Sequence, residues 1–151
     1  MTDTVAVLMP GDMGHATGRV LAGHGVEPIT CLAGRSERTK ALAQAAGFRD
    51  VETLDAVVEQ ASLILSILPP ASALSLAGDV SQAMARTGAK PVYVDCNAIS
   101  PETAKAVGAT ITEAGAPFID AGIIGLKPDG VGPGPRFYVS GPDTGPMLAL
   151  D

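Results

Sequence analysis

Short apolar runs that alternate with longer segments of helical spacing are the feature that most constrains how this chain folds. The apolar runs are bounded by glycine and proline, and they lie at 4–9, 28–32, 61–68, 91–95, 117–120 and 136–140. Helical spacing marks the segments between them, at 13–24, 36–46, 54–60, 71–86 and 100–114. Strands that alternate with helices form right-handed βαβ units. The pattern therefore predicts an α/β fold with a doubly wound, mainly parallel sheet and helices on both faces.

The composition excludes several classes of protein. A chain with 46% hydrophobic and 17% charged residues is too apolar to be disordered. A net charge of −6 argues against a nucleic-acid partner. No apolar run approaches the roughly 18 residues of a membrane helix, and the first residues lack the basic start of a secretory signal. We therefore expect a cytoplasmic protein without a membrane partner.

The cysteines and histidines suggest neither disulfides nor a metal. Cys31 and Cys96 are too few for a disulfide framework, and we interpret them as buried free thiols. The two cysteines and two histidines are scattered, without the spacing of metal ligands. Since no linker interrupts the chain, we treat 1–151 as one domain.

A glycine-containing turn follows the first apolar run. Against the dinucleotide-binding pattern G-x-G-x-x-G, Gly11 and Gly14 fill the second and third positions, while Met9 stands at the first. Gly11 would let the backbone approach a pyrophosphate, and Gly14 would let the following helix pack closely on the sheet. Asp12 is unfavourable beside a phosphate unless it points away and helps cap the helix. The turn predicts a Rossmann-type nucleotide site that includes Gly11, Asp12, Met13 and Gly14.

The residues after the second apolar run indicate which cofactor is bound. An acidic residue there would hold the free ribose 2′-hydroxyl of NAD. This chain instead has Arg35 and Ser36, and a guanidinium and a hydroxyl suit a 2′-phosphate. The sequence therefore favours NADP (NADPH) over NAD.

The chain resembles the β-hydroxyacid dehydrogenase superfamily, the relatives of 6-phosphogluconate and 3-hydroxyisobutyrate dehydrogenases. The resemblance covers nearly the whole chain, and the motifs that carry it are Gly11–Gly14, Gly34–Ser36, Ser66–Pro70, Asp95–Pro101 and Asp120–Gly125. It implies that Leu68, Pro69 and Pro70 line the cofactor site and that Asn97 contacts the nicotinamide. By the same resemblance, Gly122, Ile123 and Ile124 lie on the substrate side, together with Asn97. His15 is interpreted as structural and Lys127 as a solvated loop residue.

Two departures from the superfamily bear on function. Its substrate loop reads D-A-P-V-S-G-G, whereas Ile124 occupies the serine position here and Leu126 the last glycine. The apolar replacement is similar to the divergent branches that include imine reductases. The superfamily also has a helical C-terminal domain that supplies a general acid/base lysine and most of a dimer interface. We match no residue of 1–151 to that lysine, so the catalytic residues are unassigned.

The last stretch indicates a longer native protein. A long loop is expected at 122–135, and a new element begins near Gly141 and then stops. We therefore expect a truncated chain that binds cofactor but does not turn over by itself. Its exposed surface favours self-association, and the full-length protein is expected to form a homodimer.

The function predicted from these observations is hydride transfer between the nicotinamide and a small-molecule substrate. That substrate is a carbonyl or alcohol of the 3-hydroxyacid type, or an imine. Two alternatives stay open: a stand-alone nucleotide-binding or regulatory module, and a reductase similar to pyrroline-carboxylate or deazaflavin-dependent NADP reductases.

Overall fold

A seven-stranded sheet runs through the protein in the order β3-β2-β1-β4-β5-β6-β7. The computed structural model describes residues 3–129 and 131–150. The strands are β1 (Thr4–Leu8), β2 (Glu27–Thr30), β3 (Arg49–Asp50), β4 (Leu63–Ser66), β5 (Val92–Asp95), β6 (Phe118–Ile124) and β7 (Arg136–Ser140). The helices are α1 (Asp12–Gly23), α2 (Glu37–Ala45), α3 (Leu54–Gln60), α4 (Ala73–Thr87), α5 (Pro101–Glu113) and α6 (Gly145–Leu148), with a short 3₁₀ turn at Pro70–Ser72.

The pairing confirms the predicted doubly wound, mainly parallel sheet. Strand β1 pairs in parallel with both β2 and β4, and within the described sheet only β7 is antiparallel to its neighbour. The strand order reverses between β1 and β4, because the chain first moves outward to β3 and then returns to the other side of β1. Ligands of open α/β sheets bind beyond the carboxyl ends of the strands at such a reversal.

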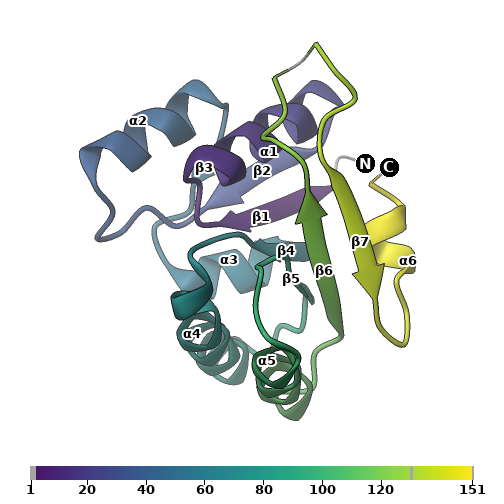
Figure 1. Ribbon diagram of the computed structural model, residues 1–151. Coiled ribbons are helices and arrows are strands. Elements are labelled where there is room, and N and C mark those ends of the chain that lie inside the picture. Colours follow the sequence, from purple (N-terminus) through teal and green to yellow (C-terminus); the bar gives the residue numbers. More distant parts are fainter. Residues whose placement is uncertain (1–2, 130, 151) are drawn as a thin grey trace.

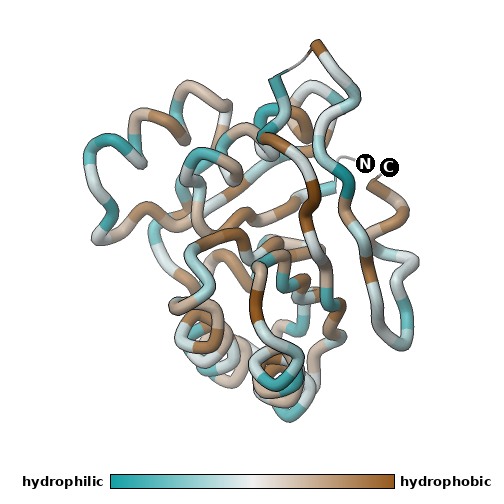
Figure 2. The backbone as a smooth tube through the Cα atoms, in the orientation of Figure 1, coloured by the Kyte–Doolittle hydropathy of each residue, from teal (hydrophilic) through white to brown (hydrophobic). Residues whose placement is uncertain are grey.

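Each face of the sheet carries its own apolar core. Successive side chains of a strand point to opposite faces, and strands covered on both sides are apolar throughout. Helices α3, α4 and α5 cover one face, where Ile64 and Tyr93 are fully buried. Helices α1 and α6 pack on the other face, over Val7, Leu65 and Ile119. Figure 2 shows the hydrophobic positions gathered in the strands, with hydrophilic positions frequent on α2 and in outer turns.

Local sequence signals account for several helix starts. Ser36, Thr53 and Ser100 precede α2, α3 and α5, and each side-chain oxygen accepts a hydrogen bond from the backbone N–H three residues later. Such caps satisfy donors that the first helical turn leaves without partners. Helix α4 ends at Gly88, whose φ of +79° is the left-handed conformation that glycine adopts readily.

The β6–β7 hairpin corrects one sequence prediction. The loop was expected to begin at Gly122, but β6 continues to Ile124, and its residues 120–124 pair with β7. The loop begins at Gly125 because a close approach closes the hairpin there: a Cβ at Gly125 would lie 3.0 Å from Pro135 Cα. A new element was expected after Gly141, and α6 is that element.

Candidate functional site

The turn between β1 and α1 gives its two glycines different roles. A Cβ built on Gly14 would lie 2.2 Å from the Met9 carbonyl oxygen and 3.2 Å from Val7 Cγ1, so only glycine allows α1 to lie this close to β1. A Cβ on Gly11 would meet no atom within 4 Å. Gly11 precedes α1 without a side-chain cap, so no side chain at the cap position occupies the first N–H groups of the helix. Backbone N–H groups at a helix start are suited to bind a phosphate.

The carboxylate of Asp12, which is unfavourable beside a phosphate, forms an ion pair. The guanidinium of Arg38, in α2, donates to Asp12 Oδ1 at 3.0 Å. Both side chains are more than half exposed, so the pair contributes little stability. It nevertheless gives the Asp12 carboxylate a cationic partner beside the glycine turn. His15 is buried, and its Nδ1 lies 2.9 Å from the Gly11 carbonyl oxygen, which agrees with a structural role.

A cleft of about 870 Å³ opens beyond the carboxyl ends of β1, β2 and β4, at the point where the strand order reverses. Four residues that the sequence singled out line it together: Gly11, Arg35, Leu68 and Pro69. Its remaining wall was not predicted: apart from Met9 and Ile67, which lie within the glycine turn and the Ser66–Pro70 motif, these residues come from segments without a motif. Those residues are Met9, Cys31, Ala33, Glu52, Thr53, Leu54, Asp55, Ile67, Ser72, Ser75, Leu76, Asp79 and Arg86.

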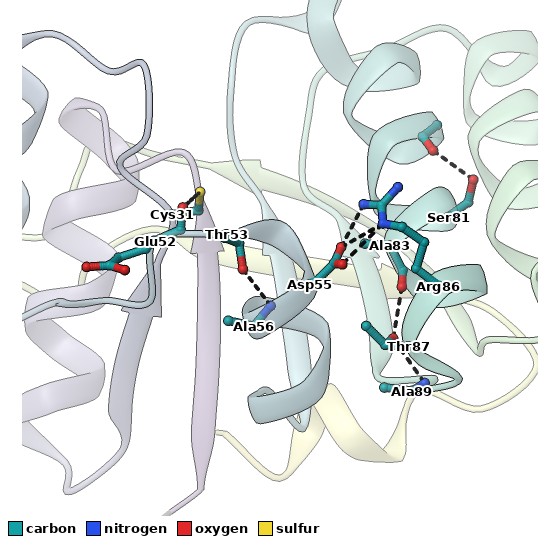
Figure 3. Close-up of polar contacts among 11 residues, drawn as sticks. Cys31, Glu52, Thr53, Asp55, Ala56, Ser81, Ala83, Arg86, Thr87 and Ala89 are labelled. Carbon is teal, nitrogen blue, oxygen red and sulfur yellow. Dashed lines mark hydrogen bonds and ion pairs between the residues drawn. The ribbon is translucent and has the colours of Figure 1, made fainter.

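Polar contacts tie α3 to α4 at the far wall of this cleft (Figure 3). Arg86 donates to Asp55 from Nε at 3.0 Å and from Nη2 at 2.6 Å. The hydrogen bond from Arg86 lowers the pKa of the Asp55 carboxyl. On the opposite side the Cys31 thiol lies 3.4 Å from the Glu52 carbonyl oxygen. Arg86 is thus already paired, whereas no ion pair of Arg35 occurs among the described residues.

The other predicted cofactor residues lie around the cleft rather than in its wall. Met13 packs against the core under α1, and Pro70 opens the exposed 3₁₀ turn after β4. Ser36 follows Arg35 directly, but its hydroxyl oxygen already accepts the Thr39 N–H at 3.2 Å as the cap of α2. Their contacts with a cofactor stay predictions.

Asn97 joins the carboxyl ends of β4 and β5. Its Oδ1 accepts the backbone N–H of Leu68 at 2.8 Å, and its Nδ2 donates to Ser66 Oγ at 3.0 Å. Its own N–H donates to Asp95 Oδ1 at 2.8 Å. Only 7% of Asn97 is exposed, so the amide first of all fixes the Leu68 turn in the cleft wall. Its contact with the nicotinamide stays a prediction.

Asp95 is a buried carboxyl group beneath this junction. The residue is fully buried, and no described residue hydrogen-bonds its second oxygen, Oδ2. Burial raises the pKa of Asp95, although the two hydrogen bonds from Asn97 oppose the shift and the charge of Asp120 adds to it. Burial likewise raises the pKa of the neighbouring Cys96 thiol, and both cysteines are free and buried as expected.

The predicted substrate-side residues do not share one face of the sheet. Gly122 lies in the wall of a second cavity, of about 330 Å³, together with Asn97. Ile123 points to the other face and packs against the core there. Ile124 returns to the face of Gly122 and is 65% exposed. Ile123 is not among the residues that line the cavity with Gly122, and a contact of these residues with substrate stays a prediction.

The cleft fits a dinucleotide by the chemistry of its walls. Gly11 leaves open space at a helix N-terminus for a pyrophosphate, and Arg35 supplies a guanidinium on the β2 side. Leu68 and Pro69 add apolar surface on the β4 side. Among the described residues no group of three or more His, Cys, Asp or Glu could hold a metal ion, and no helix is long and apolar enough to cross a membrane.

Comparison with known proteins decides the family. Residues 4–144 match the family described as the NAD binding domain of 6-phosphogluconate dehydrogenase. The chain belongs to this family. The match agrees with the resemblance to the hydroxyacid dehydrogenases, and an NAD binding domain accounts for the cleft.

Individual relatives have longer chains than this one, and two solved structures among them share its fold. An uncharacterised 28.5 kDa protein of Methanothermus fervidus is 34% identical over 100 residues, which are 66% of this chain and 37% of that one. The structure of MTH1747, a conserved protein of unknown function described as similar to 3-hydroxyacid dehydrogenases, aligns with a TM-score of 0.83 and 28% identity over 97% of this chain and 53% of its own. Streptomyces aurantiacus imine reductase aligns with a TM-score of 0.80, at 20% identity, over 98% of this chain and 51% of its own. The chain thus spans about half the length of these structures and less of the curated relative.

Proposed function

We propose that this chain is the NADP(H)-binding domain of an oxidoreductase that transfers a hydride between the nicotinamide and either a hydroxy acid or an imine. The observation that carries the NADP preference is the position of Arg35. It lines the same cleft as Gly11, on the β2 side, so one ligand can reach both. A guanidinium binds phosphate oxygens through two parallel hydrogen bonds, and no carboxylate follows β2 directly.

The chain's own residues would bind and orient the cofactor. The N–H groups at the start of α1 would hold the pyrophosphate, with the Asp12 charge held by Arg38. Asn97 would keep the Leu68 turn in place against the nicotinamide half. The cofactor, when bound, supplies the hydride chemistry. A general acid must stand within hydrogen-bond reach of the reacting atom, and we assign none in this chain.

The activity of the whole protein is also a proposal. Since the matched structures are about twice as long, we expect a second domain to complete the substrate pocket and a dimer interface. On this view the present chain binds cofactor without turning it over efficiently. We also propose a cytoplasmic location for the whole protein.

Calorimetric titration with NADPH and with NADH tests the proposal. We expect NADPH to bind at least tenfold more tightly, and Arg35→Ala to remove that preference while leaving NADH binding nearly unchanged. The preference should weaken as salt rises, since it rests on an exposed charge. Lys105→Ala is the matched control, because Lys105 is an exposed cation on α5 that lines neither cavity.

Two results would contradict the proposal. Equal affinity for NADPH and NADH would remove the assignment of the 2′-phosphate to Arg35. Absence of binding by either cofactor, with the fold intact by circular dichroism, would favour the alternative of a domain that has lost its nucleotide.

A further inference from the structure

Arg35 reaches the cofactor cleft from a tight turn that follows β2. The turn spans Leu32 to Arg35, and the Arg35 N–H donates to the Leu32 carbonyl oxygen at 3.0 Å. Gly34, its third residue, has a φ of +73°, which glycine adopts readily. Strand β2 ends at Thr30, so the turn lies beyond the backbone pairing of the sheet. The contacts of Leu32 therefore decide where the Arg35 guanidinium stands.

A carboxylate on the neighbouring edge strand holds Leu32. Asp50, the last residue of β3, accepts the Leu32 N–H at 3.1 Å and the Glu52 N–H at 2.9 Å, both on Oδ1. Among the described residues, the last backbone hydrogen bond between the β2 and β3 segments runs from the Val51 N–H to the Thr30 carbonyl oxygen. The Asp50 side chain thus continues the link between the two segments past the end of their pairing. Since Asp50 does not line the cleft, it can act on a cofactor only through the backbone that it holds.

Glu52 has a strained backbone that the same contacts maintain. Its φ is +69°, and no other described residue apart from glycine has a positive φ. A residue with a side chain keeps this conformation only where its surroundings hold it. The Glu52 N–H is bound by Asp50, and its carbonyl oxygen accepts the Cys31 thiol at 3.4 Å (Figure 3). Since Cys31, Glu52 and Arg35 all line the cleft, Asp50 links two parts of the cleft wall.

We infer that Asp50 is a positioning residue for cofactor recognition, and that it fixes the turn from which Arg35 binds the 2′-phosphate. The inference rests on the proposed function and adds a residue that determines specificity without touching the cofactor. A guanidinium pairs with phosphate oxygens in a fork of fixed geometry, so the backbone that carries it must be oriented beforehand. A turn that becomes ordered only on binding would cost affinity for NADPH. NADH has no 2′-phosphate, so its affinity depends little on the order of this turn.

The negative charge of Asp50 predicts an effect of the opposite sign. A carboxylate near the 2′-phosphate repels it, so removal of the charge alone would strengthen NADPH binding. The loss of a positioning contact would instead weaken it, because the Leu32 N–H would no longer be held. The Asp50 side chain is exposed, so salt screens its charge but leaves its hydrogen-bond geometry in place. The sign of the change in NADPH affinity therefore separates the two explanations.

Three variants of Asp50 separate geometry from charge in calorimetric titrations with NADPH and with NADH. Asp50→Ala removes the acceptor and should weaken NADPH binding by about fivefold or more, while NADH binding changes by less than about twofold. Asp50→Asn keeps an acceptor oxygen without the charge and should stay within about threefold of the parent chain. Asp50→Glu keeps the charge but displaces the oxygen by one methylene, so it should behave as Asp50→Ala does. Glu59→Ala is the matched control, because Glu59 is an exposed acid on α3 that lines neither cavity.

A double-mutant cycle tests whether Asp50 acts through Arg35. In the Arg35→Ala background no guanidinium is left to position, so Asp50→Ala should change NADPH affinity by less than about twofold. The full effect of Asp50→Ala in that background would mean that Asp50 acts by another route. Circular dichroism establishes that each variant is folded. If Asp50→Ala does not fold, the comparison of Asp50→Asn with Asp50→Glu still decides, because both keep a polar side chain at this exposed position.

Hydrogen exchange of the cofactor-free chain distinguishes failure of this inference from failure of the proposed function. The Leu32 amide should exchange at least about tenfold faster in Asp50→Ala than in the parent chain or in Glu59→Ala. A parent chain that binds NADPH no better than NADH would refute the proposed function and the specificity role with it, even where exchange shows that Asp50 holds the turn. Where the parent prefers NADPH, three results of Asp50→Ala overturn the role of Asp50 alone: an unchanged preference, tighter NADPH binding, or equal weakening of both cofactors.

Discussion

Replacing Gly14 with alanine tests the packing of α1 on the sheet. The added methyl group would stand 2.2 Å from the Met9 carbonyl oxygen, a backbone atom that cannot rotate away. Over-packing of this kind costs about 1–3 kcal/mol, and the better helix propensity of alanine returns roughly 1 kcal/mol. So close an approach to a backbone atom belongs to the upper part of that range, about 2–3 kcal/mol, and we therefore expect a net loss of about 1–2 kcal/mol in the free energy of unfolding. For a domain of this size that lowers the melting temperature by roughly 2–8 °C.

Gly11→Ala is the matched comparison, because it adds the same methyl group three residues earlier. Gly11 has a φ of −71°, which alanine adopts without strain, and no atom lies within 4 Å of the new Cβ. The stability should fall by no more than about 1 kcal/mol, the difference between these residues as helix caps. The affinity for NADPH should fall at least tenfold, since Gly11 lines the cleft.

Urea unfolding followed by circular dichroism, with NADPH titration of each folded variant, separates the two effects. The reasoning fails if Gly14→Ala is as stable as the parent chain. It also fails if Gly11→Ala binds NADPH within twofold of the parent, since the methyl group would then not meet the cofactor.

Three further predictions concern groups around the cleft. Asn97→Ala leaves the Leu68 N–H without its acceptor and should cost about 1–3 kcal/mol in urea unfolding. The pKa of Asp95 is raised in the folded state, so the folded chain keeps this proton to a higher pH than the unfolded chain does. The free energy of unfolding should therefore fall as pH rises from the pKa of the unfolded state through that of the folded state. Asp95→Asn should flatten that fall in unfolding curves at pH 4–8. Asp55→Ala should leave the melting temperature almost unchanged in thermal unfolding, since its pair with Arg86 is exposed.

The sheet could be predicted because its strands carry a strong local signal. The segment that contains β4, with Leu63, Ile64 and Leu65 in succession, is apolar on both faces, as a central parallel strand must be. Strand β3 was missed because it consists of Arg49 and Asp50, two exposed polar residues that pair with β2. Nothing in their side chains distinguishes such a strand from a turn.

The site could be predicted only where its residues belong to motifs. The glycine turn and Arg35 lie in the segments that follow β1 and β2, so the topology brings them to one edge of the sheet. The pair of Asp12 with Arg38 joins residues 26 positions apart, and no local pattern indicates it. The predicted loop start at Gly122 is wrong, because this glycine is the unfilled middle of a strand pair.

The two edge strands of the sheet, β3 and β7, differ in how well they resist pairing with another chain. Strand β3 is only two residues long and offers almost no row of backbone donors and acceptors to another chain. Strand β7 is the edge strand on the other side of the sheet; it is five residues long and contains the half-buried Phe137 and Val139. Short or charged edge strands protect sheet proteins from aggregation, and the only charged residue of β7 is Arg136. At high concentration we therefore expect copies to pair through β7, and a proline or a second charge placed there to keep the protein in solution.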